Sequence, residues 1–315
     1  MGNKTRIVTL VIVVVALAMI LLLGTRLIDS LLPVMSGSYY KDFSSHEDLE
    51  YKYSQMGEFE VKDQTVDTDD EILGKLSVWY PKVDEGTLVP MIIVANPSKM
   101  SATRYKPFFE RLASWGFVVV GNEDEQSGSG RGISETLDTM LNLVETHPLR
   151  DVIDYDRIGI IGYSQGGAGA LAAVTEYDNG KEFKAIFTGS AVCPEMAEEY
   201  GWIYDTSKVK IPYFMAAGTG ETDDNEANAA EGESKGVAPL SSLIASYDSI
   251  TANVFKIRAR VDGAEHTDVL ERSDGYMTAW MLYQLSGDEK AAEIFEGSDA
   301  KILSNDNWVD IEKNR

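Results

Sequence analysis

Cysteine is almost absent from this chain of 315 residues: Cys193 is its single thiol. One cysteine excludes an intramolecular disulfide, so the fold must be stabilised by its core. The chain offers no suitably placed second histidine to activate the thiol, which argues against a cysteine nucleophile. We therefore interpret Cys193 as a small buried hydrophobic residue.

Basic residues are scarce as well. The chain has 28 Lys and Arg against 51 Asp and Glu, a formal net charge of −23. Residues 1–26 contain three bases and no acid, so the remainder is more acidic still. Such a surface repels nucleic acid and anionic membrane, and it argues against polyanionic substrates. We expect no nucleic-acid partner. The main effect of the negative charge is to keep the protein soluble.

Long apolar runs are confined to the amino terminus. Residues 7–23 are apolar apart from Thr9, and a helix of that length spans about 25 Å, the short end of a membrane span. Lys4 and Arg6 precede the run, which predicts a cytoplasmic amino end. We predict an uncleaved signal anchor with the remaining chain outside the cell membrane. The alternative is a secreted protein, cleaved near residues 34–36.

The most informative feature is Gly162-Tyr163-Ser164-Gln165-Gly166-Gly167. An apolar, strand-like run precedes this G-x-S-x-G sequence, and a run of small, helix-forming residues follows it. A sharp turn of this kind between a strand and a helix exposes a serine hydroxyl at the end of a sheet. Ser164 is thus the candidate nucleophile.

A serine nucleophile needs a base, and only three histidines are available. His46 and His147 precede Ser164, whereas the order expected for this turn is Ser, then Asp or Glu, then His. His266 is the histidine in the required place.

The acid should follow a strand that lies between Ser164 and His266 in the sequence. Residues 219–226 form an acidic loop after such a strand. We choose Asp223, with Asp224 and Glu221 as alternatives.

Two backbone N–H groups should stabilise the oxyanion of an acyl-transfer reaction. One belongs to Gln165, which follows the nucleophile, and the other to the loop after the strand-like residues 91–95. Pro97 in that loop has no N–H, so Ser98 is the candidate donor.

No cofactor or metal site is predicted. The glycines of residues 127–132 match neither phosphate-binding pattern, and the acidic loop does not match the EF-hand spacing. The acidic residues 67–71 are interpreted as a solvated turn.

These stretches, together with residues 108–120 and 277–288, resemble the α/β-hydrolases of the dienelactone hydrolase, chlorophyllase and polyester hydrolase (cutinase-like) group. The resemblance covers roughly residues 73–295, and it departs from the group at Asn96-Pro97, where His-Gly or Pro-Gly is usual. It implies an α/β fold, with a mostly parallel central sheet and helices on both faces. One amino-terminal transmembrane helix would precede that fold.

Four regions follow from this pattern. Residues 1–28 are the predicted cytoplasmic tip and anchor, and residues 29–53 a stalk or linker. Residues 54–300 are the hydrolase domain and residues 301–315 a carboxyl-terminal tail.

We predict a membrane-anchored, extracytoplasmic carboxylic-ester hydrolase that acts on a small-molecule ester through an acyl-enzyme. Two alternatives stay open: an inactive binding or structural module at the cell surface, and an amidase or acyltransferase using the same residues. The sequence does not specify an oligomeric state.

Overall fold

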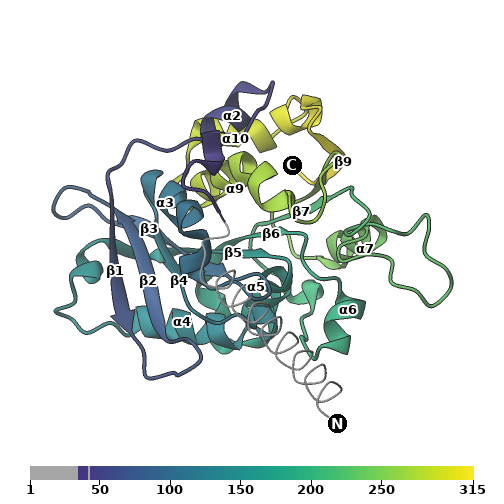
Figure 1. Cartoon of the computed structure of the whole chain (residues 1–315). Helices are drawn as coiled ribbons and strands as arrows, with labels where there is room; N and C mark the ends of the chain where they lie inside the picture. The colour runs from purple at the N-terminus through teal and green to yellow at the C-terminus, as the bar shows by residue number, and fades with distance from the viewer. Residues whose placement is uncertain (1–34, 42) are drawn as a thin grey trace, which may run out of the picture.

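The computed structural model describes residues 35–41 and 43–315 of the chain (Figure 1). The predicted transmembrane run, residues 7–23, and the rest of region 1–28 lie outside the described residues. Within the described ranges, no helix combines the length and the apolar character that crossing a bilayer requires.

One nine-stranded sheet runs through the domain in the order β1-β2-β4-β3-β5-β6-β7-β8-β9. Strands β4, β3, β5, β6, β7 and β8 pair in parallel, and β1, β2 and β9 add antiparallel pairs at the two edges. The predicted mostly parallel α/β fold is thus confirmed. The strands are β1 (Val61–Asp67), β2 (Lys75–Pro81), β3 (Val89–Ala95), β4 (Val118–Gly121), β5 (Ile153–Tyr163), β6 (Phe183–Gly189), β7 (Tyr213–Gly218), β8 (Lys256–Val261) and β9 (Trp308–Lys313).

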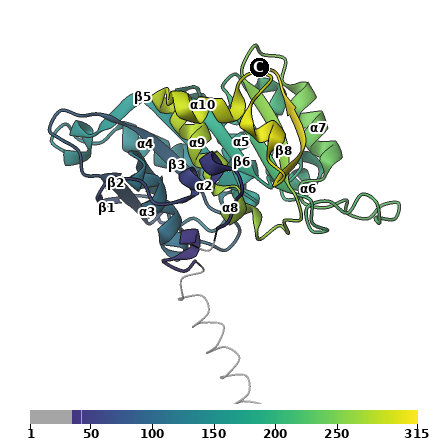
Figure 2. The same cartoon turned by 90° about the horizontal axis from the view of Figure 1, so that it is seen from above.

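Helices cover both faces of the sheet (Figures 1 and 2). In Figure 1, α2, α3, α9 and α10 lie above the strands, and α4 and α5 lie below them. The helices are α2 (Asp48–Ser54), α3 (Lys106–Ser114), α4 (Arg131–Leu141), α5 (Gln165–Glu176), α6 (Pro194–Glu199), α7 (Leu240–Ser249), α8 (Val269–Arg272), α9 (Asp274–Met281) and α10 (Glu289–Phe295). Short 3-10 segments and one π-helical turn, Leu282–Ser286, join them.

The continuous apolar sequence of the central strands follows from this sandwich. In β3, Ile92 and Val94 belong to the cluster shared with α3 and α9, while Met91 and Ile93 belong to the cluster shared with α4 and α5. Successive side chains of a strand point to opposite faces, so a strand covered on both sides must be apolar at every position.

The N-terminal segment, residues 35–41 and 43–54, packs on the domain instead of forming a free stalk. Tyr39 and Tyr53 are buried. Arg111 of α3 accounts for this, since its guanidinium donates to the Tyr39 hydroxyl at 3.0 Å and to the Tyr53 carbonyl at 2.8 Å. Asp274, the first residue of α9, pairs with the same guanidinium at 3.0 Å. The described residues of the stretch expected to be a stalk or linker, 29–53, thus pack against α3 and α9.

The tail expected over residues 301–315 is also part of the domain. Strand β9 pairs with β8 and forms one edge of the sheet. The buried carboxylate of Glu50 in α2 accepts hydrogen bonds from the Trp308 indole at 2.6 Å and the Asn307 amide at 2.7 Å. These bonds connect the N-terminal segment to the carboxyl-terminal strand, far apart in the sequence.

The buried cation gives a stability prediction. Arg111→Met should lower the free energy of unfolding by about 3–5 kcal/mol, because it leaves the Asp274 carboxylate buried without a counter-ion. Arg111→Met/Asp274→Leu should recover much of the loss, since both charges are then removed. Urea denaturation measures the difference.

Lys75→Met is the matched control for these variants. Lys75 pairs with Asp67 at an exposed site, so its loss should cost at most about 1 kcal/mol. The free energy of unfolding lost by Arg111→Met/Asp274→Leu is compared with the sum of the losses of Arg111→Met and Asp274→Leu. Equality of the two would show that the charges of Arg111 and Asp274 are not coupled.

Candidate active site

Ser164 occupies a strained turn between β5 and α5. Its φ and ψ of 56° and −124° are unusual for a residue with a side chain. The backbones are so close here that a Cβ on Gly162 would lie 2.1 Å from the Gly166 carbonyl oxygen. A Cβ on Gly166 would lie 2.2 Å from the carbonyl oxygen of Ala95. The two glycines therefore permit the turn that places the Ser164 hydroxyl at the end of the sheet.

The structure brings Ser164, His266 and Asp223 together. The His266 Nε2 atom lies 2.9 Å from the Ser164 Oγ, and its Nδ1 lies 2.6 Å from the Asp223 Oδ1. The three residues follow β5, β8 and β7, whose carboxyl ends meet at one edge of the parallel sheet. Residues separated by 102 positions thus form one hydrogen-bonded chain, here called the Ser–His–Asp array.

The second oxygen of Asp223 is occupied too. Its Oδ2 accepts a hydrogen bond from the Ser190 hydroxyl at 2.5 Å and from the Gly218 N–H at 2.7 Å. Asp223 has no exposed surface, so each of these donors compensates a carboxylate that water does not reach. Sequence reasoning missed Ser190, since a single serine after a strand carries no signal without the register of β6 against β7.

The neighbouring carboxylates have other partners. Asp224 pairs with Arg260 of β8 at 2.5 Å, and the same guanidinium binds Asp310 of β9 at 2.6 Å. Glu221 is exposed. Of the three acids considered for this loop, Asp223 is the one in contact with His266, while Asp224 joins the loop to the edge of the sheet.

The loop after β3 faces the first turn of α5. The Ser98 hydroxyl donates to the side-chain oxygen of Gln165 at 3.1 Å, and the Gln165 amide donates to the Glu125 carbonyl at 3.2 Å. In the part of the chain that the structure describes, the backbone N–H groups of Ser98 and Gln165 have no acceptor. The two N–H groups expected to stabilise an oxyanion are therefore not occupied by another acceptor among the described residues.

Asn96 fixes the start of that loop. It is fully buried, and its amide donates to the carbonyls of Asn122 at 2.9 Å and of Asp124 at 2.9 Å. The Tyr105 hydroxyl donates to the Asn96 side-chain oxygen at 2.7 Å. This departure from the usual His-Gly or Pro-Gly thus has a structural role, since it joins the loops after β3 and β4.

Two side chains near the array stay uncharged. The ring of Tyr163 lies 5.3 Å from that of His266, and burial raises the pKa of its hydroxyl well above the usual range. Burial also raises the pKa of the Cys193 thiol, which lies against the Gly236 carbonyl. The prediction of a small, buried cysteine is confirmed by its exposure of 7%. A thiol with a raised pKa is a poor nucleophile at neutral pH.

The acidic stretch at residues 67–71 leads from the end of β1 into a turn. Asp70 accepts from the backbone of Ile72 and Leu73 and pairs with Arg131 at 2.6 Å. Across residues 35–41 and 43–315, no three His, Cys, Asp or Glu side chains gather in a way that could hold a metal ion.

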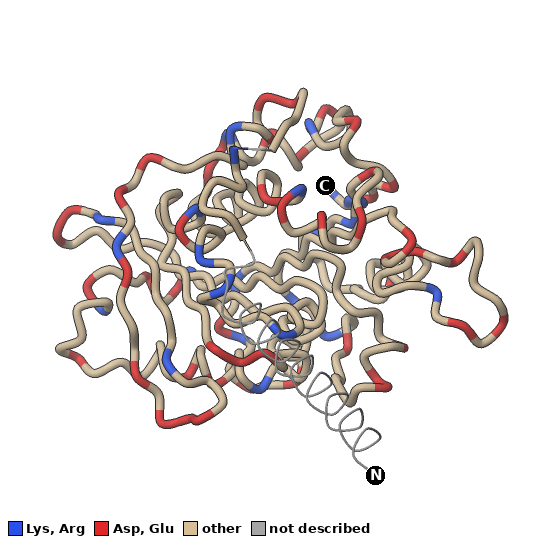
Figure 3. The backbone as a smooth tube through the Cα atoms, in the orientation of Figure 1, with Lys and Arg blue, Asp and Glu red and all other residues tan. Residues whose placement is uncertain are grey.

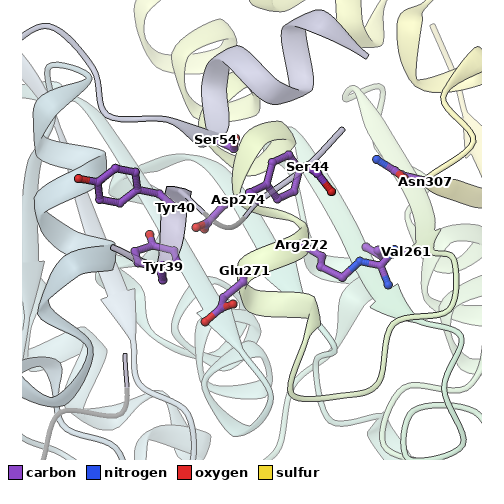
Figure 4. Close-up of a pocket in the computed structure, with 10 residues that line it drawn as sticks. Tyr39, Tyr40, Ser44, Ser54, Val261, Glu271, Arg272, Asp274 and Asn307 are labelled. Atoms are coloured by element: carbon purple, nitrogen blue, oxygen red, sulfur yellow. The ribbon is translucent and has the colours of Figure 1, made fainter. Parts of the chain in front are cut away.

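A pocket of about 330 Å³ lies between the N-terminal segment and helices α8 and α9 (Figure 4). Tyr39, Tyr40 and Asp274 line one part of it, and Arg272 and Asn307 another. The Arg272 guanidinium donates to the Asp262 carbonyl at 2.7 Å, in the loop that carries His266. The pocket therefore lies next to the loop that carries His266. Its lining does not include Ser164, His266 or Asp223.

Comparison with known proteins gives two matches. The family model described as PET hydrolase-like matches residues 50–306, well over half of the chain. A protein named Lipase 1 from Moraxella sp. (strain TA144) is 32% identical to this chain over 106 residues. That alignment covers 32% of each protein, so the chain matches about a third of the length of this relative.

Proposed function

Because the chain belongs to the PET hydrolase-like family, we propose that it is a serine ester hydrolase with Ser164 as nucleophile, His266 as base and Asp223 as the acid that orients the base. The observation that carries the proposal is the position of His266. Its two nitrogens lie at hydrogen-bond distance from Ser164 on one side and Asp223 on the other. This is the arrangement that nucleophilic catalysis by serine requires.

The reaction would proceed in two halves. His266 Nε2 accepts the Ser164 proton as Oγ bonds to the ester carbonyl carbon, and the charge on the carbonyl oxygen is stabilised by the N–H groups of Ser98 and Gln165. The intermediate then expels the alcohol, which takes the proton from His266, and an acyl-enzyme remains. Water repeats the sequence on the acyl-enzyme and releases the acid. Asp223 stabilises the imidazolium formed in each half.

The charge around the site favours uncharged esters. The loop that carries Asp223, residues 219–239, contains six acids and one lysine, and Figure 3 shows acidic residues on the loops at this edge of the sheet. Repulsion by these carboxylates disfavours polyanionic substrates and assists the departure of the carboxylate product.

We further propose that residues 7–23 anchor the protein in the cell membrane and that the hydrolase domain lies outside it. The apolar run and the preceding Lys4 and Arg6 support this orientation. Secretion after cleavage of the segment is the alternative that the experiment below distinguishes.

Removal of the nucleophile tests the reaction type. Ser164→Ala should reduce hydrolysis of a p-nitrophenyl ester by at least about 10⁴-fold, because the members of such an array act as a unit. A fluorophosphonate probe should label the wild-type protein and fail to label this variant. Cys193→Ala is the control, and it should retain both labelling and turnover. Near-wild-type hydrolysis by Ser164→Ala would refute the assignment.

A second set of variants tests the choice of acid. Asp223→Asn should reduce turnover by about 10³- to 10⁴-fold with the fold intact, because an amide favours the wrong imidazole tautomer. Asp224→Asn and Glu221→Gln should each cost less than about tenfold, since neither side chain touches His266. Steady-state kinetics with circular dichroism measures both effects. A severe loss in Asp224→Asn or Glu221→Gln with a mild one in Asp223→Asn would reassign the acid within the same loop.

Membrane topology is open to direct measurement. External protease should degrade the hydrolase domain on intact cells or spheroplasts, and the full-length protein should stay in the membrane pellet after a carbonate wash. A shortened form in the medium would indicate a cleaved signal peptide. Protection from external protease would contradict the proposed orientation.

A further inference from the structure

Ser190 is in an unusual position beside the Ser–His–Asp array. It is the first residue after β6 and is fully buried. Its φ of 45° lies in the left-handed region, which residues with a side chain seldom adopt. Its N–H donates to the Ala216 carbonyl of β7 at 2.8 Å, so the hydrogen bonds between these strands continue through the strained residue.

The chain around Ser190 touches both ends of the array. The Ser164 N–H donates to the Gly189 carbonyl at 2.9 Å, directly before Ser190. The Ser190 hydroxyl donates to Asp223 Oδ2 at 2.5 Å. Residues 189 and 190 thus connect the turn of the nucleophile to the acid, over a path that does not include His266.

Three hydrogen bonds determine the orientation of the Asp223 carboxylate. Oδ1 faces His266 at 2.6 Å, and Oδ2 accepts from Ser190 and from the Gly218 N–H. The Gly218 donor is the last residue of β7 and precedes Asp223 by only five residues, whereas Ser190 directly follows a different strand, β6. The Ser190 hydroxyl therefore connects the Oδ2 atom of the carboxylate to the end of β6.

We propose that Ser190 is a positioning residue for the hydrolytic reaction, an inference that rests on the proposed function of Ser164, His266 and Asp223. Its hydroxyl holds the Asp223 carboxylate in the plane and at the distance that His266 Nδ1 requires. The left-handed backbone conformation of Ser190 directs its hydroxyl toward Asp223. The backbone strain at this residue is thus retained because it places the hydroxyl where the carboxylate needs a donor. Ser190 has no exposed surface, so its effect should be on turnover and not on substrate binding.

Two variants remove the hydroxyl in different ways. Ser190→Ala should lower kcat roughly 10- to 100-fold with KM unchanged, because a hydrogen bond to a charged group is lost. Ser190→Gly should show the same fall in kcat. It should be at least as stable as Ser190→Ala, because glycine adopts a positive φ without strain. A thermal melt of both variants separates the backbone effect from the loss of the hydroxyl.

Thr188→Val, in β6 two residues before Ser190, is the matched control. The buried Thr188 hydroxyl lies 2.7 Å from the Tyr213 hydroxyl, away from Asp223. This variant also removes a buried hydrogen bond, and it should lower Tm while leaving kcat at the wild-type value.

A double-mutant cycle gives the sharpest readout. In an Asp223→Ala background the Ser190 hydroxyl has lost its acceptor, so adding Ser190→Ala should change the residual kcat less than twofold. A purely structural Ser190 would instead add its full loss to that of Asp223→Ala. Such additivity, or a wild-type kcat in both single variants, would overturn the proposal.

Fluorophosphonate labelling separates this inference from the one on which it rests. Wild type, Ser190→Ala and Ser190→Gly should all be labelled to completion on Ser164, with the two variants labelled more slowly. Failure of the wild type to be labelled would overturn the hydrolase proposal and the role of Ser190 together. Full labelling of all three at one rate would overturn the role of Ser190 alone.

Discussion

The arrangement of the site depends on one buried carboxylate. Asp223 has no exposed surface, and an ionised group without water must receive hydrogen bonds from the protein. Its three donors come from the ends of β6, β7 and β8, at Ser190, Gly218 and His266. The register of these strands therefore determines whether the Asp223 carboxylate receives its hydrogen bonds. A shift of any one strand would leave the buried charge without a donor.

A second set of buried charges joins the two ends of the chain. Arg111 holds the N-terminal segment against α3 and α9, and Glu50 of that segment binds the residues that lead into β9. Strand β9 in turn carries Asp310, which binds Arg260 together with Asp224. The carboxyl-terminal strand thus contacts both the N-terminal segment and the loop of the acid.

The parts of the structure that the sequence predicted are those with a local cause. Gly162 and Gly166 flank Ser164 because the turn leaves no room for a Cβ at either position. Six consecutive residues are therefore enough to predict this turn from the sequence. His266 could be chosen because the chain order excluded the other histidines. The sequence alone does not separate Asp223 from Asp224, because adjacent carboxylates differ only in the direction that the backbone gives them.

What the sequence did not predict depends on partners far along the chain. Tyr39 and Tyr53 in a polar stretch resemble a linker until Arg111 is known to lie beneath them. Ser190 gains a role only when β6 and β7 are aligned, so its 33-residue separation from Asp223 hides the contact.

The N-terminal segment and the loop that carries His266 are linked through Arg111 and Asp274. This residue lies in the loop between β8 and α8, and β8 ends at Val261, which lines the pocket of Figure 4. The other end of the loop leads through α8 to Asp274, the partner of the Arg111 guanidinium. The same cation therefore holds the N-terminal segment and the helix that follows the His266 loop. In this fold the N-terminal segment thus shares a buried cation with the helix that follows the His266 loop, although it supplies no residue to the Ser–His–Asp array.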